Sequence, residues 1–324
     1  MINVPDNIKN IIPYVPGKPI EELERELGIS GSIKLASNEN PLGPSPKAVA
    51  AIKKVLEGLN RYPDGTGFYL SQALAKHYDV DSAQVLLGNG SNELIELVVR
   101  TFVQPGDEII SADPSFVVYT MITQAAGGTN VVVPCKDLRH DLDAMADRIT
   151  AKTKIVFIAN PNNPTGTINT KGEMDRFMAR IPDHVIVAVD EAYYEYATHA
   201  DYPDSLDYLR AGKNVLALRT FSKIYGLAGL RIGYGITKPE LAGLITKCAS
   251  RSIPTHWHRR ARWRPFRTAN MSKNPSRSTT RASSSSSSPS NGSGSLLPRR
   301  RRTSSSSSPR LTPKSCTRRS SRRG

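Results

Sequence analysis

The sequence predicts an α/β fold in which a mostly parallel central sheet is covered by helices. Two observations indicate this fold class. From Ser45 onward, short continuous apolar segments alternate regularly with helical patterns, and this alternation favours parallel strands buried on both faces. The chain of 324 residues is also long enough for one large α/β domain and a smaller one.

The expected strands are short apolar runs bounded by turn residues, at 85–87, 108–110, 131–133, 154–158, 185–189, 215–218 and 232–236. The expected helices lie at 20–27, 46–57, 68–77, 92–103, 117–126, 171–179 and 239–247. Residues 12–19 contain too many prolines for a helix or a central strand. Residues 1–45 are therefore expected to form an N-terminal arm.

Segment 248–324 differs in composition from the rest of the chain. It holds 19 of the 44 Lys and Arg residues but no Asp or Glu, so residues 1–247 carry 25 basic and 29 acidic side chains although the whole chain has a net charge of +15. Its serine and arginine runs lack apolar periodicity, a composition typical of disorder. We expect a large domain at 46–247 followed by a disordered low-complexity tail at 248–324.

Cysteine usage and hydropathy exclude two classes of protein. Of the three cysteines only Cys135 lies before the tail, which excludes a disulfide framework and fits a reducing compartment. No apolar run approaches the length of a membrane span, and the N-terminus lacks the basic and apolar regions of a signal peptide. The sequence therefore predicts a cytoplasmic protein.

Polar residues that could bind a ligand follow two of the expected strands. Gly88–Glu93 is a glycine turn that opens onto a helix, which presents backbone N–H groups to a phosphate. Asn160–Gly166 contains two Asn-Pro steps, which favour a rigid extended loop that can aim an amide inward. Earlier in the chain, Leu35–Pro44 is either a plain connector or, through its asparagines, part of a site wall.

Two further strand ends carry a carboxylate and a lysine. Asp190 lies at the tip of its strand with no basic residue nearby in sequence, and a buried carboxylate needs a cation. Lys223 lies in the turn after its strand, and Arg231 follows eight positions on. A buried lysine can react with an aldehyde, whereas an exposed loop lysine is the alternative interpretation. The four strand ends together fit a ligand with a phosphate, an aldehyde and a protonatable nitrogen, as in pyridoxal phosphate.

These motifs resemble the fold-type I pyridoxal-phosphate aminotransferases, and within them the histidinol-phosphate aminotransferase subfamily. The resemblance covers residues 8–247. It is carried by motifs in the family's order, at 13–22, 38–44, 60–64, 88–93, 160–166, 190–193 and 220–235. The proline-rich motif at 13–22 favours this subfamily over other aminotransferases.

The resemblance implies pyridoxal 5′-phosphate as cofactor, no metal, and a role for each matching residue. Lys223 is implied to be the Schiff-base lysine and the base that moves a proton from Cα to C4′. Asp190 would pair with the ring nitrogen, and Asn163 and Tyr193 would bind the ring hydroxyl. Phe116 would stack on the ring, although a core side chain is the alternative.

The remaining implied residues bind the cofactor phosphate, namely Gly90, Ser91, Asn92, Thr220, Ser222 and Arg231. Tyr62 would reach that phosphate from the partner subunit of a homodimer. The implied reaction belongs to histidine biosynthesis and exchanges an amino group between glutamate and imidazole-acetol phosphate, which gives histidinol phosphate and 2-oxoglutarate.

The resemblance stops at Lys247, where the family continues into a small domain that supplies an arginine for the substrate anion. A one-base frameshift near Lys247 accounts for the tail, because serine codons that begin with TC become Phe, Leu, Ile or Val codons in the shifted frame. One alternative is an inactive fragment whose basic tail binds nucleic acid non-specifically. Another is a related enzyme, such as an aromatic aminotransferase or a threonine-phosphate-type decarboxylase.

Overall fold

The computed structural model of the chain describes residues 2–249. The expected disorder and shifted frame of the tail concern residues outside this range, apart from Cys248 and Ala249. The described part contains the strands β1 (Val85–Gly88), β2 (Glu108–Asp113), β3 (Thr129–Pro134), β4 (Thr153–Ala159), β5 (Ile186–Asp190), β6 (Val215–Thr220) and β7 (Gly233–Ile236). Each of them overlaps a strand that the sequence predicts.

The strands form one sheet in the order β1-β7-β6-β5-β4-β2-β3. Strands β2 to β6 pair in parallel, whereas β7 is antiparallel to both β1 and β6. The predicted mostly parallel sheet is thus confirmed. Strand β7 runs the other way because the chain turns back after β6 with only a short 3₁₀ helix, Ala228–Leu230, in place of a crossover helix.

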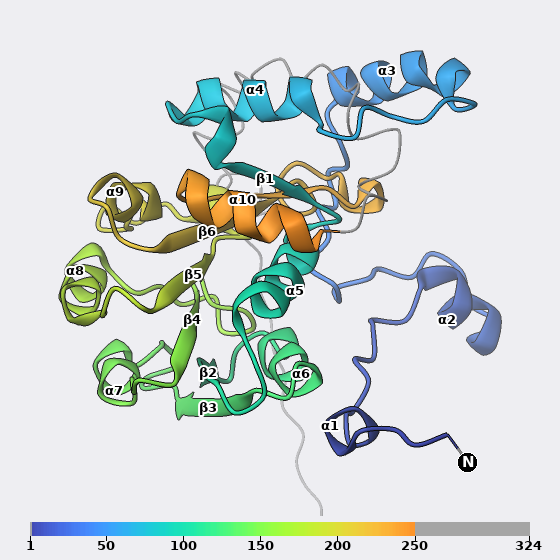
Figure 1. Cartoon of the computed structure of the whole chain (residues 1–324). Coiled ribbons are helices and arrows are strands. Elements are labelled where there is room, and N and C mark those ends of the chain that lie inside the picture. The colour runs from blue at the N-terminus through green and yellow to red at the C-terminus, as the bar shows by residue number, and fades with distance from the viewer. Residues whose placement is uncertain (1, 250–324) are drawn as a thin grey trace, which may run out of the picture. The chain divides into compact units, whose positions relative to one another are not determined.

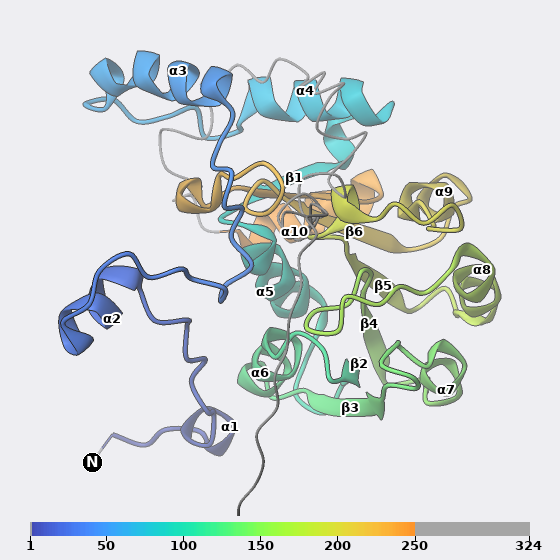
Figure 2. The same cartoon turned by 180° about the vertical axis from the view of Figure 1, so that it is seen from behind.

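Helices cover both faces of the sheet (Figures 1 and 2). On one face lie α5 (Ser91–Phe102), α6 (Val118–Ala125) and α10 (Pro239–Cys248), and on the other lie α7 (Leu142–Asp147), α8 (Lys171–Arg180) and α9 (Ser205–Arg210). This arrangement is the one that alternating strands and helices predict.

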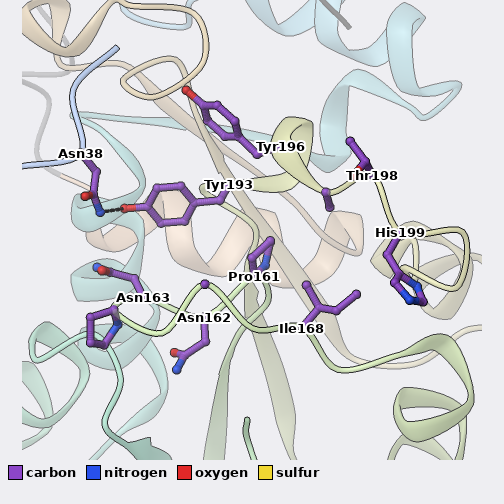
Figure 3. A pocket seen from close by; sticks show the side chains of 12 residues that line it. Asn38, Pro161, Asn162, Asn163, Ile168, Tyr193, Tyr196, Thr198 and His199 are labelled. Carbon is purple, nitrogen blue, oxygen red and sulfur yellow. Dashed lines mark hydrogen bonds between the residues drawn. The ribbon is translucent and has the colours of Figure 1, made fainter. Parts of the chain in front are cut away.

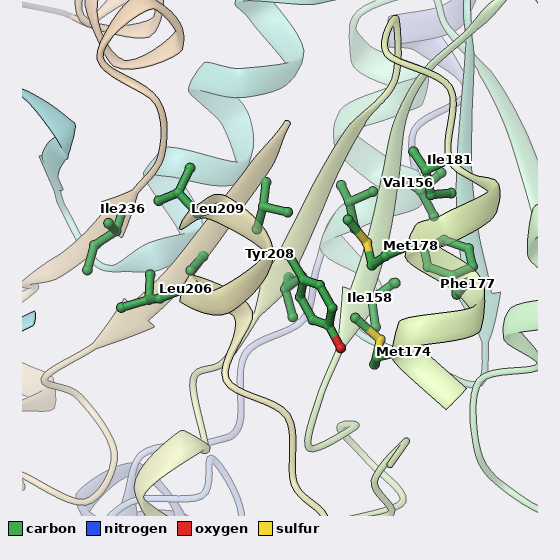
Figure 4. Close-up of a cluster of buried hydrophobic side chains, with 14 of the residues drawn as sticks. Val156, Ile158, Met174, Phe177, Met178, Ile181, Leu206, Tyr208, Leu209 and Ile236 are labelled. Carbon is green, nitrogen blue, oxygen red and sulfur yellow. The ribbon is translucent and has the colours of Figure 1, made fainter. Parts of the chain in front are cut away.

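Two apolar cores lie on opposite faces of the sheet because successive strand residues point in opposite directions. In β4, Val156 and Ile158 pack with α8, whereas Ile155 and Phe157 pack with α5 and α6. Figure 4 shows part of the first core, where methionines and Phe177 from α8 meet the strands and α9. The sheet is buried between these cores, and its polar strand ends are left at the edge.

The N-terminal segment contains α1 (Asp6–Lys9) and α2 (Ile20–Leu27) and precedes α3 (Pro46–Val55) and α4 (Phe68–Tyr78). Helix α1 contacts the end of α6, where Asn7 Nδ2 donates hydrogen bonds to the carbonyl oxygens of Gln124 and Ala125 at 3.2 and 3.1 Å. Within residues 2–249, no helix is both long and apolar enough to cross a membrane.

Three helices that the sequence patterns do not predict are α1, α7 and α9, which have 4, 6 and 6 residues. They are too short to show an amphipathic period. Helices α7 and α9 each begin after an aspartate whose side chain accepts a hydrogen bond from a backbone N–H, Asp141 from Ala144 and Asp204 from Leu206. Local capping, rather than apolar spacing, thus marks these two helices.

Candidate active site

A cavity of about 340 Å³ lies where the loops after β1, β4, β5 and β6 meet. Its wall includes every residue predicted to bind the cofactor except Tyr62, namely Gly90, Ser91, Asn92, Phe116, Asn163, Asp190, Tyr193, Thr220, Ser222, Lys223 and Arg231. The charged side chains among the lining residues are Asp190, Lys223 and Arg231. The cavity therefore combines one carboxylate with two cations.

Asp190 ends β5, and its side chain is 7% exposed. Its carboxylate accepts hydrogen bonds from the Tyr119 hydroxyl at 2.8 Å and from the backbone N–H of Ala192 at 3.1 Å. Burial raises the pKa of Asp190, while these two bonds and the charge of Lys223 lower it. Within the chain, the direct contacts of this carboxylate come from neutral donors, and Lys223 acts on it only through its charge.

A buried ion pair joins the ends of β5 and β6 beside the cavity. Arg219 Nε donates to Glu191 Oε2 at 2.8 Å, and both side chains are 1% exposed. The arginine also lies over the ring of Tyr194, 3.7 Å from its centroid. Because Glu191 and Arg219 are the sequence neighbours of Asp190 and Thr220, this pair fixes the two strand ends that carry site residues.

Lys223 lies in the loop after β6, and its Nζ donates a hydrogen bond to the carbonyl oxygen of Ser37 at 3.3 Å. Burial lowers the pKa of Lys223, and the charge of Arg231 lowers it further, against the opposite effects of Asp190 and Glu39. A larger fraction of Lys223 is consequently in the neutral amine form than for a lysine in water at the same pH. This is the environment that a nucleophilic amine needs.

Tyr193 borders the cavity on the β5 side, and its hydroxyl accepts a hydrogen bond from Asn38 Nδ2 at 2.8 Å (Figure 3). Burial raises the pKa of Tyr193, which keeps the phenol protonated. Because the hydroxyl accepts from Asn38, its own proton can be donated into the cavity. Asn38 comes from the segment Leu35–Pro44, so this segment is part of the site wall.

The N-terminus of α5 forms a cradle suited to an anion. Gly90 precedes this helix of 12 residues with φ 77°, and no side chain caps the first N–H groups. Arg231, also left-handed at φ 57°, lies next to Gly90, where an added Cβ would be 2.7 Å from the guanidinium. Uncapped helix N–H groups beside an arginine attract phosphate.

Two hydroxyl residues lie near Arg231, but they are oriented differently. Arg231 donates to Ser222 Oγ at 3.4 Å. The Thr220 hydroxyl donates instead to the carbonyl oxygen of Ile232 at 3.2 Å and accepts from the backbone N–H of Ser222 at 3.1 Å. In this arrangement Ser222 is the better placed of the two to contact a bound anion.

A second cavity of about 510 Å³ adjoins the first and shares Pro161, Asn163 and Tyr193 with it. Figure 3 shows its other side chains, among them Tyr196 and His199 from the segment after β5. Asn163 thus lies between the two cavities, at the loop where the sequence predicts an inward amide.

Phe116 and Tyr62 are the two predicted aromatic contacts. Phe116 lines the first cavity just before α6, and its ring meets that of Tyr119 edge to face, with centroids 5.6 Å apart. Tyr62 is fully exposed at 101% and lies outside the cavity wall. Its predicted contact requires a second subunit and remains a prediction.

Sequence reasoning missed Tyr119 and Asn38 as site residues, although it named the segment of Asn38. Tyr119 lies three residues after Phe116, and its backbone N–H donates to the Phe116 carbonyl oxygen at 3.2 Å in the turn that leads into α6. No local sequence signal identifies it, because its partner Asp190 lies 71 positions away. In the described residues 2–249, no group of His, Cys, Asp and Glu side chains could hold a metal ion.

Comparison with known proteins identifies the family. A family profile for aminotransferase class I and II matches residues 30–259. The chain belongs to this family of aminotransferases. Within it, the chain is 53% identical over 235 residues to the histidinol-phosphate aminotransferase of Moorella thermoacetica, a match that covers 72% of this chain and 61% of that protein.

Two further proteins agree with this assignment. Histidinol-phosphate aminotransferase 2 of Pseudomonas fluorescens Pf0-1 is 52% identical over 242 residues, which cover 74% of this chain and 65% of the relative. The crystal structure of the Sinorhizobium meliloti histidinol-phosphate aminotransferase in complex with pyridoxal-5′-phosphate matches with a TM-score of 0.73 and 28% identity, over 81% of this chain and 70% of that one. The chain thus spans less than two thirds of the length of the two curated relatives.

Proposed function

We propose that the chain is a pyridoxal-phosphate-dependent aminotransferase that transfers an amino group between histidinol phosphate and 2-oxoglutarate. One observation carries the proposal. A partly buried lysine, a buried carboxylate and an uncapped helix N-terminus with an arginine all border one cavity of about 340 Å³. Relatives at 53% and 52% identity are named histidinol-phosphate aminotransferases, which supports the substrate.

The residues of the cavity fit each polar group of the cofactor. At Gly90, where a Cβ would crowd Arg231, the guanidinium lies beside the uncapped N-terminus of α5, and the two together would hold a phosphate. Asp190 has one hydrogen bond on each oxygen, so a lone pair is left to accept from a ring N–H. Lys223 supplies the amine for the aldehyde.

When bound, the cofactor supplies an electron-withdrawing ring that takes up the electron pair left on the substrate carbon. The rest of the chemistry belongs to the chain. Lys223 would be released from the cofactor when the substrate amine takes its place on the aldehyde carbon. As a free amine it would then take the proton from the substrate Cα, because its lowered pKa favours the neutral form. Asp190 would hold a proton on the ring nitrogen by its negative charge. Tyr193, whose hydroxyl accepts from Asn38, would donate its proton to the ring hydroxyl, and Asn163 lines the same cavity.

We further propose a cytoplasmic homodimer in which Tyr62 reaches the partner's cavity. The full exposure of Tyr62 supports this, as does the exposure of apolar side chains in the N-terminal segment, such as Ile12 at 86% and Leu35 at 90%. Sedimentation analysis tests the dimer. The Tyr62→Ala variant should bind the cofactor more weakly while it still sediments as a dimer, and a monomeric wild type would contradict the proposal.

Covalent capture of the cofactor tests the role of Lys223. Borohydride added to the protein with pyridoxal phosphate should fix one cofactor on the peptide that contains Lys223, as mass spectrometry would show. Lys223→Ala should abolish the attachment, whereas Lys238→Ala should retain it because Lys238 bonds to Asn214 away from the cavity. Attachment that persists in Lys223→Ala would refute the assignment.

Substrate assays separate the alternatives. Histidinol phosphate should be transaminated faster than aromatic amino acids, and threonine phosphate should release no carbon dioxide. If instead the tail defines the function, the full chain should bind duplex DNA with an affinity that falls steeply with salt, and no amino transfer should be measured.

A further inference from the structure

Tyr119 is a buried side chain that the proposed reaction does not yet use. It lies in α6 and is 1% exposed. Its ring stacks on Phe157 of β4, with centroids 4.6 Å apart and an interplanar angle of 7°. Its hydroxyl lies 2.8 Å from Asp190 Oδ2, at the wall of the cavity.

The direction of this hydrogen bond is fixed by protonation. Burial, together with the charge of Asp190, raises the pKa of Tyr119 well above its ordinary value, so the phenol keeps its proton and donates it. A hydrogen bond donated to a carboxylate stabilises the ionised form. The same bond fixes the rotation of the carboxylate, because the other oxygen accepts from the backbone N–H of Ala192.

We propose that Tyr119 is a positioning residue that keeps the Asp190 carboxylate ionised and aimed at the ring nitrogen of the cofactor. This role rests on the proposed function, because it acts on the cofactor through Asp190. The stack on Phe157 fixes the ring of Tyr119 and so holds its hydroxyl at the carboxylate. The Tyr119 side chain therefore loses no further conformational freedom when the cofactor binds.

The arrangement also couples two walls of the cavity. Phe116 lies two residues before α6 and Tyr119 lies in its first turn, and their rings are in edge-to-face contact. The aromatic side chain predicted to lie on the ring face is therefore in direct contact with the tyrosine that orients Asp190. Pre-organisation of this kind is what a bound pyridine ring needs from both its face and its nitrogen.

Tyr119→Phe tests the proposal because it removes one oxygen atom and keeps the stacked ring. The matched control is Tyr208→Phe, whose hydroxyl also donates to a carboxylate, Asp175 Oδ1 at 2.8 Å, but away from the cavity. Dissociation constants are measured for pyridoxal phosphate and for an analogue with CH in place of the ring nitrogen. Tyr119→Phe should bind pyridoxal phosphate about ten- to a hundredfold more weakly than wild type, the factor for one lost hydrogen bond to a charged group.

The analogue separates positioning from packing. If the hydroxyl acts through the ring nitrogen, Tyr119→Phe and wild type bind the analogue equally, and Tyr208→Phe matches wild type with both compounds. Equal losses of affinity for both compounds in Tyr119→Phe, or no loss for either, would overturn the proposal.

A second measurement needs no cofactor. In the protein without cofactor, ¹³C NMR titration of labelled aspartate should give Asp190 a higher pKa in Tyr119→Phe than in wild type, with Lys223 and Glu191 as the neighbouring charges in both. An unchanged Asp190 pKa would refute the role of Tyr119. If the titration shifts as expected but wild type forms no borohydride-stable link at Lys223, the proposed function fails while the contact between Tyr119 and Asp190 stands.

Discussion

Gly233→Ala should disrupt the anion cradle by forcing α5 away from β7. Gly233 begins β7, and a Cβ built there would lie 2.2 Å from the backbone nitrogen of Ser91 and 2.3 Å from the carbonyl carbon of Gly90. Ordinary non-bonded contacts begin at about 3.5 Å, so the start of α5 must shift by roughly 1 Å. Both of these contacts are with backbone atoms, so no side-chain rotation can relieve the overlap.

Two losses should follow from this shift. Overpacking of a tight core contact costs about 1–3 kcal/mol of the free energy of unfolding. A displacement of about 1 Å in a binding group can cost roughly a hundredfold in activity, and we expect a comparable loss in affinity for the cofactor phosphate. Urea denaturation would measure the first quantity, and titration with pyridoxal phosphate would measure the second.

Gly243→Ala is the matched control. Gly243 lies inside α10, and a Cβ there would meet no atom within 4 Å. Alanine is the better helix former by about 1 kcal/mol, so this variant should be slightly more stable and should bind the cofactor as wild type does. Unchanged stability and unchanged affinity in Gly233→Ala would refute the view that the missing Cβ shapes the cradle.

Three other outcomes are expected. Asp190→Asn should weaken cofactor binding at least as much as Tyr119→Phe does. At saturating cofactor it should slow the proton transfer from the substrate by several orders of magnitude, because the ring nitrogen loses its ionic partner; single-turnover kinetics with near-normal rates would contradict this. Burial lowers the pKa of His140 to about 4 from 6.5, so between these values the unfolded chain binds a proton that the folded chain lacks. Stability should therefore fall by about 2 kcal/mol from pH 7 to pH 5, and His140→Gln should remove most of that loss, as denaturation at both pH values would show. Insertion of one base into the DNA after the Lys247 codon should open a frame that resembles the aminotransferase family, and an early stop codon in that frame would reject the frameshift.

The strands and most of the longer helices could be predicted because their sequence patterns are local. The run at 154–158 predicts β4, since a continuous apolar segment with flanking polar residues suits a strand buried on both faces. The short helices α7 and α9 were not predicted, because each is marked by an aspartate cap and not by a repeating apolar pattern. The reversed direction of β7 follows from the connection after β6, which contains no crossover helix.

Site residues could be predicted where the residue type and its position after a strand indicate a chemical role. They could not be predicted where the role depends on a partner far away in the sequence. Lys223 and Asp190 stand out because a lysine and a carboxylate follow buried strands. Tyr119 reads as an ordinary core aromatic, and only the fold brings its hydroxyl to a residue 71 positions away. The cation expected for Asp190 is the ring nitrogen of the cofactor, and this pairing stays a prediction.

The contacts of residues 37–40 with the site have a consequence for synthesis of the chain. Asn38, Asn40 and Ser37 bond to Tyr193, Ile224 and Lys223, at sequence separations of 155, 184 and 186. At about 5–20 residues per second of translation, this segment leaves the ribosome roughly 10–40 s before its partners exist. During that interval it cannot adopt its final contacts, so the wall around Lys223 closes only after β6 has been made.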